Sequence, residues 1–229
     1  MSIAFYINLL LSLSFLLVTV LVLKKSHNIA NIAFSWTTAL FSLSTFFGLV
    51  EELYTDQIIP GSIPALITIL DNVIFPLAPL GLVFSSFIIK NGYSSWKNLT
   101  LWIFTILYVI IENTLFFLSF TKDYSVLNEI MNLTIWNALL IIPLMISVII
   151  FFSIYREMNE EKSKMLIVVI GVATGTLGQV LNSIGIFISN DDLVLISYIV
   201  IVIGVLVVSL SFMNITSSSQ TRSIAPSPN

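Results

Sequence analysis

Hydrophobic residues are grouped along the chain into seven long runs, which short polar segments separate. A helix that spans the apolar core of a bilayer needs about 20 mainly apolar residues, at a rise of about 1.5 Å per residue. The segments that meet this length are 3–23, 29–50, 63–89, 99–120, 133–155, 165–189 and 193–213. Turn-forming pairs such as Asn91-Gly92 and Asn190-Asp191 lie between them. The pattern predicts an all-α protein, an integral membrane bundle of seven transmembrane helices.

The two ends of the chain differ in character. No Lys or Arg precedes the first run, whereas Lys24 and Lys25 follow it. This order is the reverse of a secretory signal peptide, so we expect a retained helix. The last residues, 215–229, are rich in serine and include Pro226 and Pro228, a composition typical of disorder. We therefore predict one membrane domain over 1–214, followed by a disordered cytoplasmic tail over 215–229.

Basic residues fall almost entirely on one side of the predicted bundle. Only 9% of the residues are charged, against about 25% in soluble domains. Eight of the nine Lys and Arg residues lie in the first, third and fifth connecting segments or in the C-terminal tail, and Lys122 is the exception. The positive-inside rule makes this side cytoplasmic and places the N-terminus outside. We expect a multi-pass protein in the plasma membrane of a prokaryote, with the lipid bilayer as a partner.

Several kinds of chemistry lack the residues that they require. The chain has no cysteine and a single histidine, His27, so thiolate and histidine-cluster metal sites are not expected. No predicted span contains a lysine, so helix 7 lacks the Schiff-base residue of retinal proteins, and we expect no cofactor. No nucleophile elbow, metal motif or phosphate loop is present. We therefore expect no enzyme, no catalytic residue and no nucleic-acid partner.

Two carboxylates lie inside the predicted spans, Asp71 and Glu112. A charge at mid-bilayer is costly, so such residues normally face the bundle interior and mark function. Both lie about 12 Å below the outer ends of their helices, at about 1.5 Å per residue. Four amides share this outer half: Asn72, Asn137, Gln179 and Asn182. We predict that the six residues form one outward-facing site for a ligand, a proton or a cation.

Simpler roles remain open for the same residues. Asp71 and Glu112 could both be protonated and only hydrogen-bonded. Asn137 and Asn182 could each form an interhelical hydrogen bond worth about 0.6 kcal/mol. Tyr198 is expected to act as an anchor at the outer membrane interface.

Helical spacing assigns faces to two of the predicted spans. Tyr108 and Glu112 fall on one side of the fourth helix. On the sixth helix, glycines form a stripe of small residues, which lets helices approach closely in lipid. The members of the stripe are Gly171, Gly175, Gly178 and Gly185. Asn182 lies on the same stripe, so we expect it to face protein.

The third predicted span contains Pro76 and Pro79. Proline removes a backbone donor and tends to kink a helix. Because Asp71 and Asn72 lie one turn before Pro76, a kink there would free carbonyl groups beside a carboxylate. We predict a hinge at Pro76 and Pro79, with packing alone as the alternative.

The second and third helices carry a resemblance to a known family. The residues that carry it are Phe41-Ser42-Leu43, Gly48-Leu49-Val50-Glu51-Glu52-Leu53, Phe75-Pro76-Leu77 and Leu82-Val83-Phe84. Over about 50 residues the chain resembles the seven-helix N-terminal sensor region of prokaryotic histidine kinases. The resemblance implies seven spans, an outside N-terminus and a sensory role. No kinase domain follows helix 7, so a signal would pass to a separate partner.

These observations favour a stand-alone seven-helix sensor or receptor-like protein with an outward-facing polar pocket. The first alternative is a small transporter or channel for a cation or small solute. Carriers built as three plus one plus three helices would show an inverted repeat, and helix 7 has no prolines to match Pro76 and Pro79. The second alternative is an accessory subunit of a larger membrane complex, with the glycine stripe as the contact surface.

Overall fold

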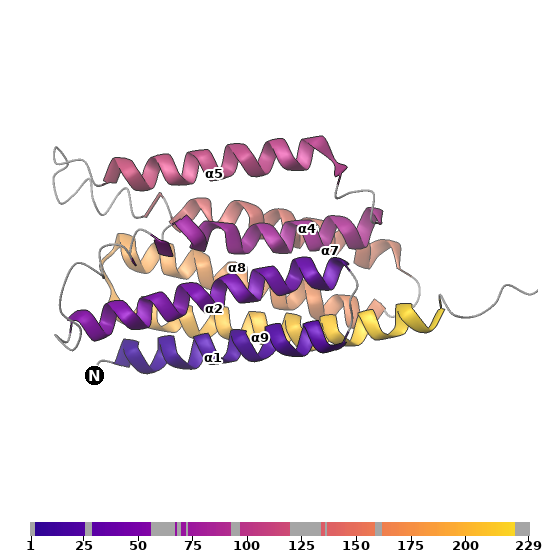
Figure 1. The fold of residues 1–229 in the computed structure, drawn as a ribbon, viewed down its shortest axis with the longest axis horizontal. Helices are drawn as coiled ribbons and strands as arrows, with labels where there is room; N and C mark the ends of the chain where they lie inside the picture. The colour runs from indigo at the N-terminus through magenta and orange to yellow at the C-terminus, as the bar shows by residue number, and fades with distance from the viewer. Residues whose placement is uncertain are drawn as a thin grey trace, which may run out of the picture.

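The computed structural model describes residues 3–25, 29–55, 67, 70–71, 73–92, 97–119, 134–135, 137–158 and 162–222, and its regular secondary structure over these residues is all helical. Its elements are α1 (Ile3–Lys25), α2 (Ile29–Thr55), the 3-10 helix η1 (Phe75–Leu77), α4 (Ala78–Asn91), α5 (Leu99–Ser119), α7 (Ile141–Glu157), α8 (Lys162–Phe187) and α9 (Asp191–Arg222). The long helices lie side by side along one common direction (Figure 1). The prediction of an all-α protein is confirmed.

Five described segments are long and apolar enough to cross a membrane. They are Phe5–Lys24, Asn31–Val50, Asn137–Glu157, Lys162–Phe187 and Asp191–Ser211. Phe75–Asn91 and Leu99–Leu115 are apolar but shorter. Helices suit a bilayer because each satisfies its backbone hydrogen bonds internally. The fold is consistent with a multi-pass membrane protein.

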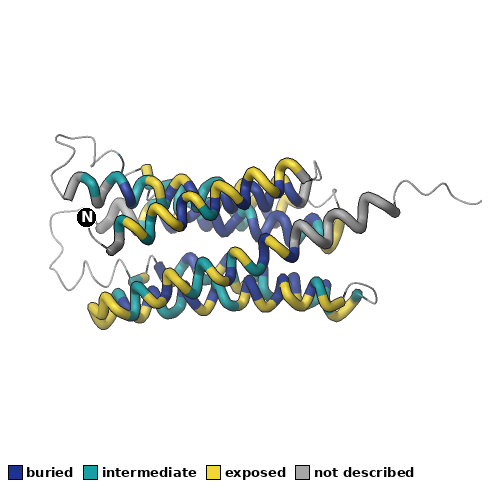
Figure 2. Tube along the Cα trace, turned by 90° about the horizontal axis from the view of Figure 1, so that it is seen from below, coloured by how far each residue is buried: buried dark blue, intermediate teal, exposed yellow. Residues whose placement is uncertain are grey.

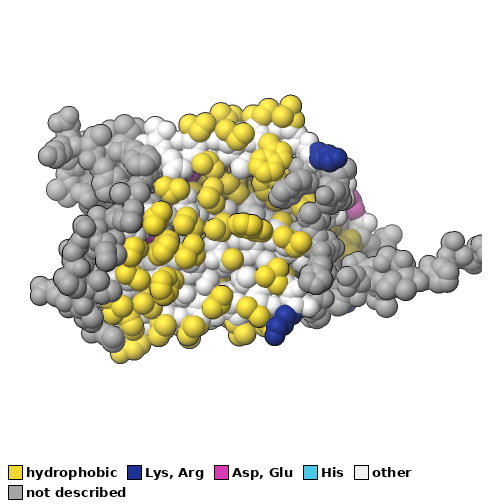
Figure 3. Space-filling model, viewed as in Figure 1, with side chains coloured by type: hydrophobic (Ala, Val, Ile, Leu, Met, Phe, Trp, Pro, Cys, Tyr) yellow, Lys and Arg dark blue, Asp and Glu magenta, His cyan; other side chains and the backbone are white. Residues whose placement is uncertain are grey.

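The surface of the bundle is apolar along its sides and basic at one end. Buried residues line the faces that the helices turn toward each other, and exposed residues follow the outer faces (Figure 2). Hydrophobic side chains cover the side of the bundle seen in Figure 3, and the visible Lys and Arg side chains lie at one end. We call this the basic end; α1 ends there near Lys24, α4 ends there near Lys90, and α8 begins there at Lys162.

Six of the helices form a closed ring. In order around the ring, α1 packs against α2, α2 against α4, α4 against α7, α7 against α8, α8 against α9, and α9 against α1. The helix α5, which corresponds to the fourth predicted span, lies outside this ring (Figure 1). It touches η1, and a contact between the rings of Phe84 and Trp102, with centroids 5.1 Å apart, joins it to α4.

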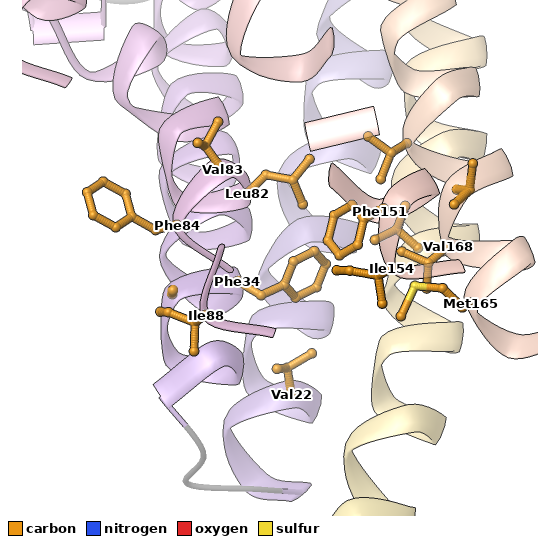
Figure 4. Close-up of a cluster of buried hydrophobic side chains, with 14 of the residues drawn as sticks. Val22, Phe34, Leu82, Val83, Phe84, Ile88, Phe151, Ile154, Met165 and Val168 are labelled. Atoms are coloured by element: carbon orange, nitrogen blue, oxygen red, sulfur yellow. The ribbon is translucent and has the colours of Figure 1, made fainter. Parts of the chain in front are cut away.

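The half of the ring interior toward the basic end is filled by an apolar cluster. Val22, Phe34, Phe151, Ile154 and Met165 belong to it, and none is more than 7% exposed. Figure 4 shows these side chains projecting from several helices into the shared interior. We call this group the apolar plug, because it closes the ring at that level.

Small polar side chains join α1 to α2. Ser12 Oγ donates to Ser42 O at 3.1 Å, and Ser42 Oγ donates to Ser12 O at 2.9 Å. One level closer to the basic end, the hydroxyls of Thr19 and Thr38 lie 2.8 Å apart. Such pairs hold helices together where lipid removes the hydrophobic driving force.

Glycine allows α8 and α9 to pack closely. A Cβ atom added at Gly171 would lie 2.9 Å from Val208 N, and one added at Gly178 would lie 2.9 Å from Ile201 N. A Cβ atom at Gly185 would meet Val194 N at 3.0 Å. Three members of the predicted stripe therefore face α9, whereas nothing lies within 4 Å of the corresponding position at Gly175.

The helix ends follow the polar breaks in the sequence, with two differences. The third predicted span does not continue as one α-helix, because η1 interrupts it at Pro76 before α4 begins. At the other end of the chain, α9 continues to Arg222, so residues 215–222 differ from the predicted disordered tail. No proline occurs in α9, and extending a helix that is already formed costs little per residue.

Candidate functional site

The ring of six helices encloses a cavity of about 480 Å³, a size typical of small-molecule sites. Phe34, Leu82, Val172 and Val208 line it and also belong to the apolar plug. The plug is therefore the floor of the cavity. The opposite part of the lining comes from the start of α1, the end of α2, the end of α8 and the start of α9.

An amide cluster forms one polar wall of this cavity. Asn137 Oδ1 accepts hydrogen bonds from Gln179 Nε2 at 3.3 Å and from Asn182 Nδ2 at 3.2 Å. Gln179 Nε2 also donates to Asn137 O at 3.2 Å, and Ser197 Oγ donates to Asn182 Oδ1 at 3.4 Å. The three amides are each at most 6% exposed. The cluster joins α8 to α9 and to the segment that leads into α7.

Asp71 and Tyr198 lie on another part of the lining. Asp71 is on the helical segment that precedes η1, and its carboxylate is close enough to the Tyr198 phenol for an electrostatic interaction. Asn8 of α1 also lines the cavity and lies against Gly48 of α2, where an added Cβ would meet Asn8 Nδ2 at 3.2 Å. The polar groups of the cavity therefore come from both sides of the ring.

Aromatic rings connect the polar part of the lining to the floor. Phe15 and Phe41 stack with centroids 5.4 Å apart, and Phe41 meets Phe75 edge-on at 5.8 Å. All three line the cavity. A molecule in this cavity would meet amide and carboxylate groups toward one end and an apolar, aromatic surface toward the other.

The structure brings most of the predicted site residues together, but not all of them. Asp71, Asn137, Gln179 and Asn182 share the one cavity. Asn72 lies outside the described residues. Glu112 is on α5, which contributes no lining residue, so the two acids do not meet in this cavity. Equal depth did not imply a shared pocket, because depth follows from position along a helix, whereas neighbours depend on the order of helices around the ring.

The remaining predicted positions fall close to the cavity. Pro76 and Pro79 are buried next to it, and η1 interrupts the helix at Pro76, one of the two positions of the predicted hinge. Gly171 and Gly175 line the cavity, while Gly171, Gly178 and Gly185 form the α8–α9 contact. The glycine stripe therefore has both a packing side and a cavity side.

Sequence reasoning did not select Asn8 or Tyr198 as site residues. Asn8 is an amide inside the first apolar run, and its polarity is a signal that could have identified it. Tyr198 was interpreted as an interfacial anchor, since aromatic residues near span ends usually have that role. Its position on the cavity depends on the α8–α9 contact, which composition alone does not define.

The described part of the chain offers hydrogen bonding and shape, not metal chemistry. Within it, no three His, Cys, Asp or Glu side chains gather so as to hold a metal ion. Ser183 and Ser197 lie near the amides, but neither is hydrogen-bonded to a basic side chain. The arrangement is suited to binding a small molecule.

Comparisons of the chain with protein-family models, with curated proteins and with solved structures give no match. The functional argument therefore depends on the geometry of the cavity.

Proposed function

We propose that the protein is a receptor-like membrane sensor that crosses the bilayer seven times, with its N-terminus outside and its C-terminus in the cytoplasm. The five span-like helices support this, together with two shorter apolar helices, Phe75–Asn91 and Leu99–Leu115. The grouping of Lys24, Lys90 and Lys162 at the basic end supports the orientation.

The cavity is the proposed sensory site. The observation that carries this proposal is that the cavity lining changes from polar to apolar along the helix axes. The amides and Asp71 lie toward one end of the cavity, and the apolar plug lies toward the basic end. In the proposed orientation the polar part faces outside. The ligand is a small amphipathic molecule whose polar group meets Asp71 and the amides and whose apolar part reaches Phe15 and Phe34.

Signal transmission is proposed to start at η1. Phe75 lines the cavity, and the next residue, Pro76, is buried in the helix interruption. A ligand that displaces Phe75 would move α4 relative to the segment before it. The output would reach a separate cytoplasmic or membrane partner through the basic end of α4, where Lys90 lies 3.5 Å from Glu157 of α7.

Cysteine accessibility tests the cavity directly, because the native chain has no cysteine and gives no background. Nothing lies within 4 Å of a Cβ atom built at Gly175, which lines the cavity, so Gly175→Cys should be tolerated. We expect a small cationic methanethiosulfonate added outside to modify this thiol readily. Asp71→Asn should slow the reaction by several-fold, since it removes the negative charge near the reagent.

Leu177→Cys is the matched control on the same helix, because Leu177 is 54% exposed on the outer surface. Its thiol would face lipid, stay un-ionised and react roughly tenfold more slowly, since the thiolate is the reactive species. Equal rates at the two positions, or reaction of Gly175→Cys from the cytoplasmic side only, would refute the outward-facing cavity.

A carrier is the second candidate, and the order of helices in the ring favours it. Around the ring, the triplet α1, α2 and α4 is followed in chain order by the triplet α7, α8 and α9. Because the single helix α5 separates the triplets along the chain, they run in the same direction. The expected inverted repeat was therefore the wrong kind of symmetry for this topology. Solute flux in proteoliposomes, or reaction of Gly175→Cys from both sides, would favour the carrier.

A further inference from the structure

Glu112 is the acidic residue of α5, and its side chain is buried. It is 0% exposed, and neither Oε1 nor Oε2 has a hydrogen-bond partner among the residues that the structure describes. Tyr108 lies one helical turn away on the same face, and its hydroxyl is close enough to interact with the Glu112 carboxyl group, although the two groups do not have the geometry of a formed hydrogen bond. The pair lies outside the cavity.

The pair is level with the helix interruption. The helices α4 and α5 run in opposite directions and meet at Phe84 and Trp102. Counting an equal number of residues away from the basic end leads from Trp102 to Glu112 on α5. The same count leads from Phe84 to Ile74, which lies directly before η1. The contact between α5 and η1 agrees with this register. Glu112 therefore belongs to the α5 face that packs on η1.

Among the described residues, those around Glu112 provide no positive charge. Tyr108 is the titratable neighbour on α5, and η1 consists of Phe75, Pro76 and Leu77. On α4, Lys90 lies at the basic end, where it is bonded to Ser153 and paired with Glu157. An ionised carboxylate in such a place would cost several kcal/mol without compensation. A neutral carboxylic acid avoids that cost.

We propose that Glu112 is a proton-binding site distinct from the cavity, which holds a proton while α5 is seated on η1. When α5 moves away and water reaches the carboxyl group, the O–H bond breaks, the proton passes to water and the carboxylate keeps the electron pair. Tyr108 is a positioning residue, because its hydroxyl can donate to the carboxylate that forms.

The same geometry links the proton to the cavity, and this part of the proposal rests on the proposed function. Phe75 contacts Phe41 in the cavity wall, while its own element, η1, meets α5 on the other side. A molecule that displaces Phe75 would disturb the seat of α5 and expose Glu112. Occupation of the cavity therefore promotes release of the Glu112 proton.

Infrared spectroscopy of the full chain in lipid bilayers tests the proton site. At neutral pH the wild type should show the C=O band of a protonated carboxylic acid, and this band should disappear in Glu112→Gln. The band should remain in the matched control Asp192→Asn, because Asp192 is exposed, and it should shift in Tyr108→Phe. A band of unchanged intensity and frequency in Glu112→Gln, or no such band in the wild type, would overturn the proposal.

A measurement on the wild type covers the case in which Glu112→Gln does not fold. Dicyclohexylcarbodiimide is an apolar reagent that adds to protonated carboxyl groups. Mass spectrometry should locate its adduct on Glu112, with a yield that falls as the pH rises. Adducts at other positions without one at Glu112 would contradict the proposal.

The link to the cavity has its own readout. Modification of Gly175→Cys with the cationic methanethiosulfonate should change the intensity or frequency of the Glu112 band, whereas modification of Leu177→Cys should leave it unchanged. An unaltered band in the modified Gly175→Cys protein would refute the link. If Gly175→Cys does not react but the band is present, the proposed cavity function fails and the proton site stands.

Discussion

At the scale of single residues, the buried amides show how one polar contact serves two roles. Asn137 Oδ1 accepts from both Gln179 and Asn182, so the amides hold helices together and also line the cavity. The hydrogen-bonding alternative and the binding hypothesis for Asn137 and Asn182 are therefore compatible. Side chains that are fixed by mutual hydrogen bonds present a preorganised polar wall to a ligand.

Asn137→Ala should lower the free energy of unfolding by about 1–2 kcal/mol, because it leaves two buried amide groups with fewer acceptors. The measurement is reversible unfolding in mixed detergent micelles. The control is Ser183→Ala, since Ser183 Oγ donates only to Gln179 O within its own helix at 3.0 Å, and its loss should cost less than about 0.5 kcal/mol. Equal losses for both variants would contradict the interhelical role of Asn137.

The sequence allowed the burial of polar residues to be predicted at this scale, but not their partners. Gln179 and Asn182 are on adjacent turns of one helix, so their shared face follows from helical spacing. Along the chain, Asn137 is 42 residues from Gln179 and 45 residues from Asn182. A long-range contact of that kind depends on how α7 is placed against α8, which no local pattern specifies.

At the scale of elements, the α8–α9 pair depends on glycines from both helices. A Cβ atom at Gly204 of α9 would meet the backbone of α8, at Gly175 N and at 2.7 Å from Gly171 O. Backbone atoms cannot move aside as a flexible side chain can. Gly204→Ala should therefore separate the helices and lower the free energy of unfolding by about 1–3 kcal/mol.

Gly175→Ala is the matched control, because it adds the same methyl group to the facing helix where nothing lies within 4 Å. Alanine also has the better helix propensity, by up to about 1 kcal/mol, so this variant should be neutral or more stable. Thermal unfolding in detergent distinguishes the two. A loss in Gly175→Ala as large as in Gly204→Ala would show that the close approach at Gly204 is not the cause.

Local sequence signals predicted where elements end better than which elements touch. Asn91-Gly92 ends α4, where Gly92 has a φ of 78° and its N–H donates to Ile88 O at 2.9 Å. Glycine is favoured at this positive φ, because it has no Cβ atom to clash with the backbone. By contrast, Gly204 is a single glycine in its helix, and its importance is visible only once α8 is packed against it.

At the scale of the whole molecule, the apolar runs predicted the helices but not the position of α5. Each run is apolar enough to face either lipid or protein, so its composition does not assign it a place in the bundle. The structure leaves α5 outside the ring, with Ile103, Ile106 and Ile110 about half exposed. This arrangement separates Glu112 from Asp71. A prediction of their meeting would have required the order of helices around the ring, which depends on side-chain packing between distant segments.

The seven-span topology makes a prediction that separates it from a five-span alternative. Without α4 and α5 as spans, Asn91 at the end of α4 would lie outside; with them, it lies in the cytoplasm. We expect Asn91→Cys to resist a membrane-impermeant maleimide added to intact cells and to react after permeabilisation. Asp192→Cys should react in intact cells and Ser163→Cys only after permeabilisation under either topology, so these two variants calibrate the assay. Because the native chain has no cysteine, each signal belongs to one position. Reaction of Asn91→Cys in intact cells would place the end of α4 outside and remove two spans from the proposed bundle.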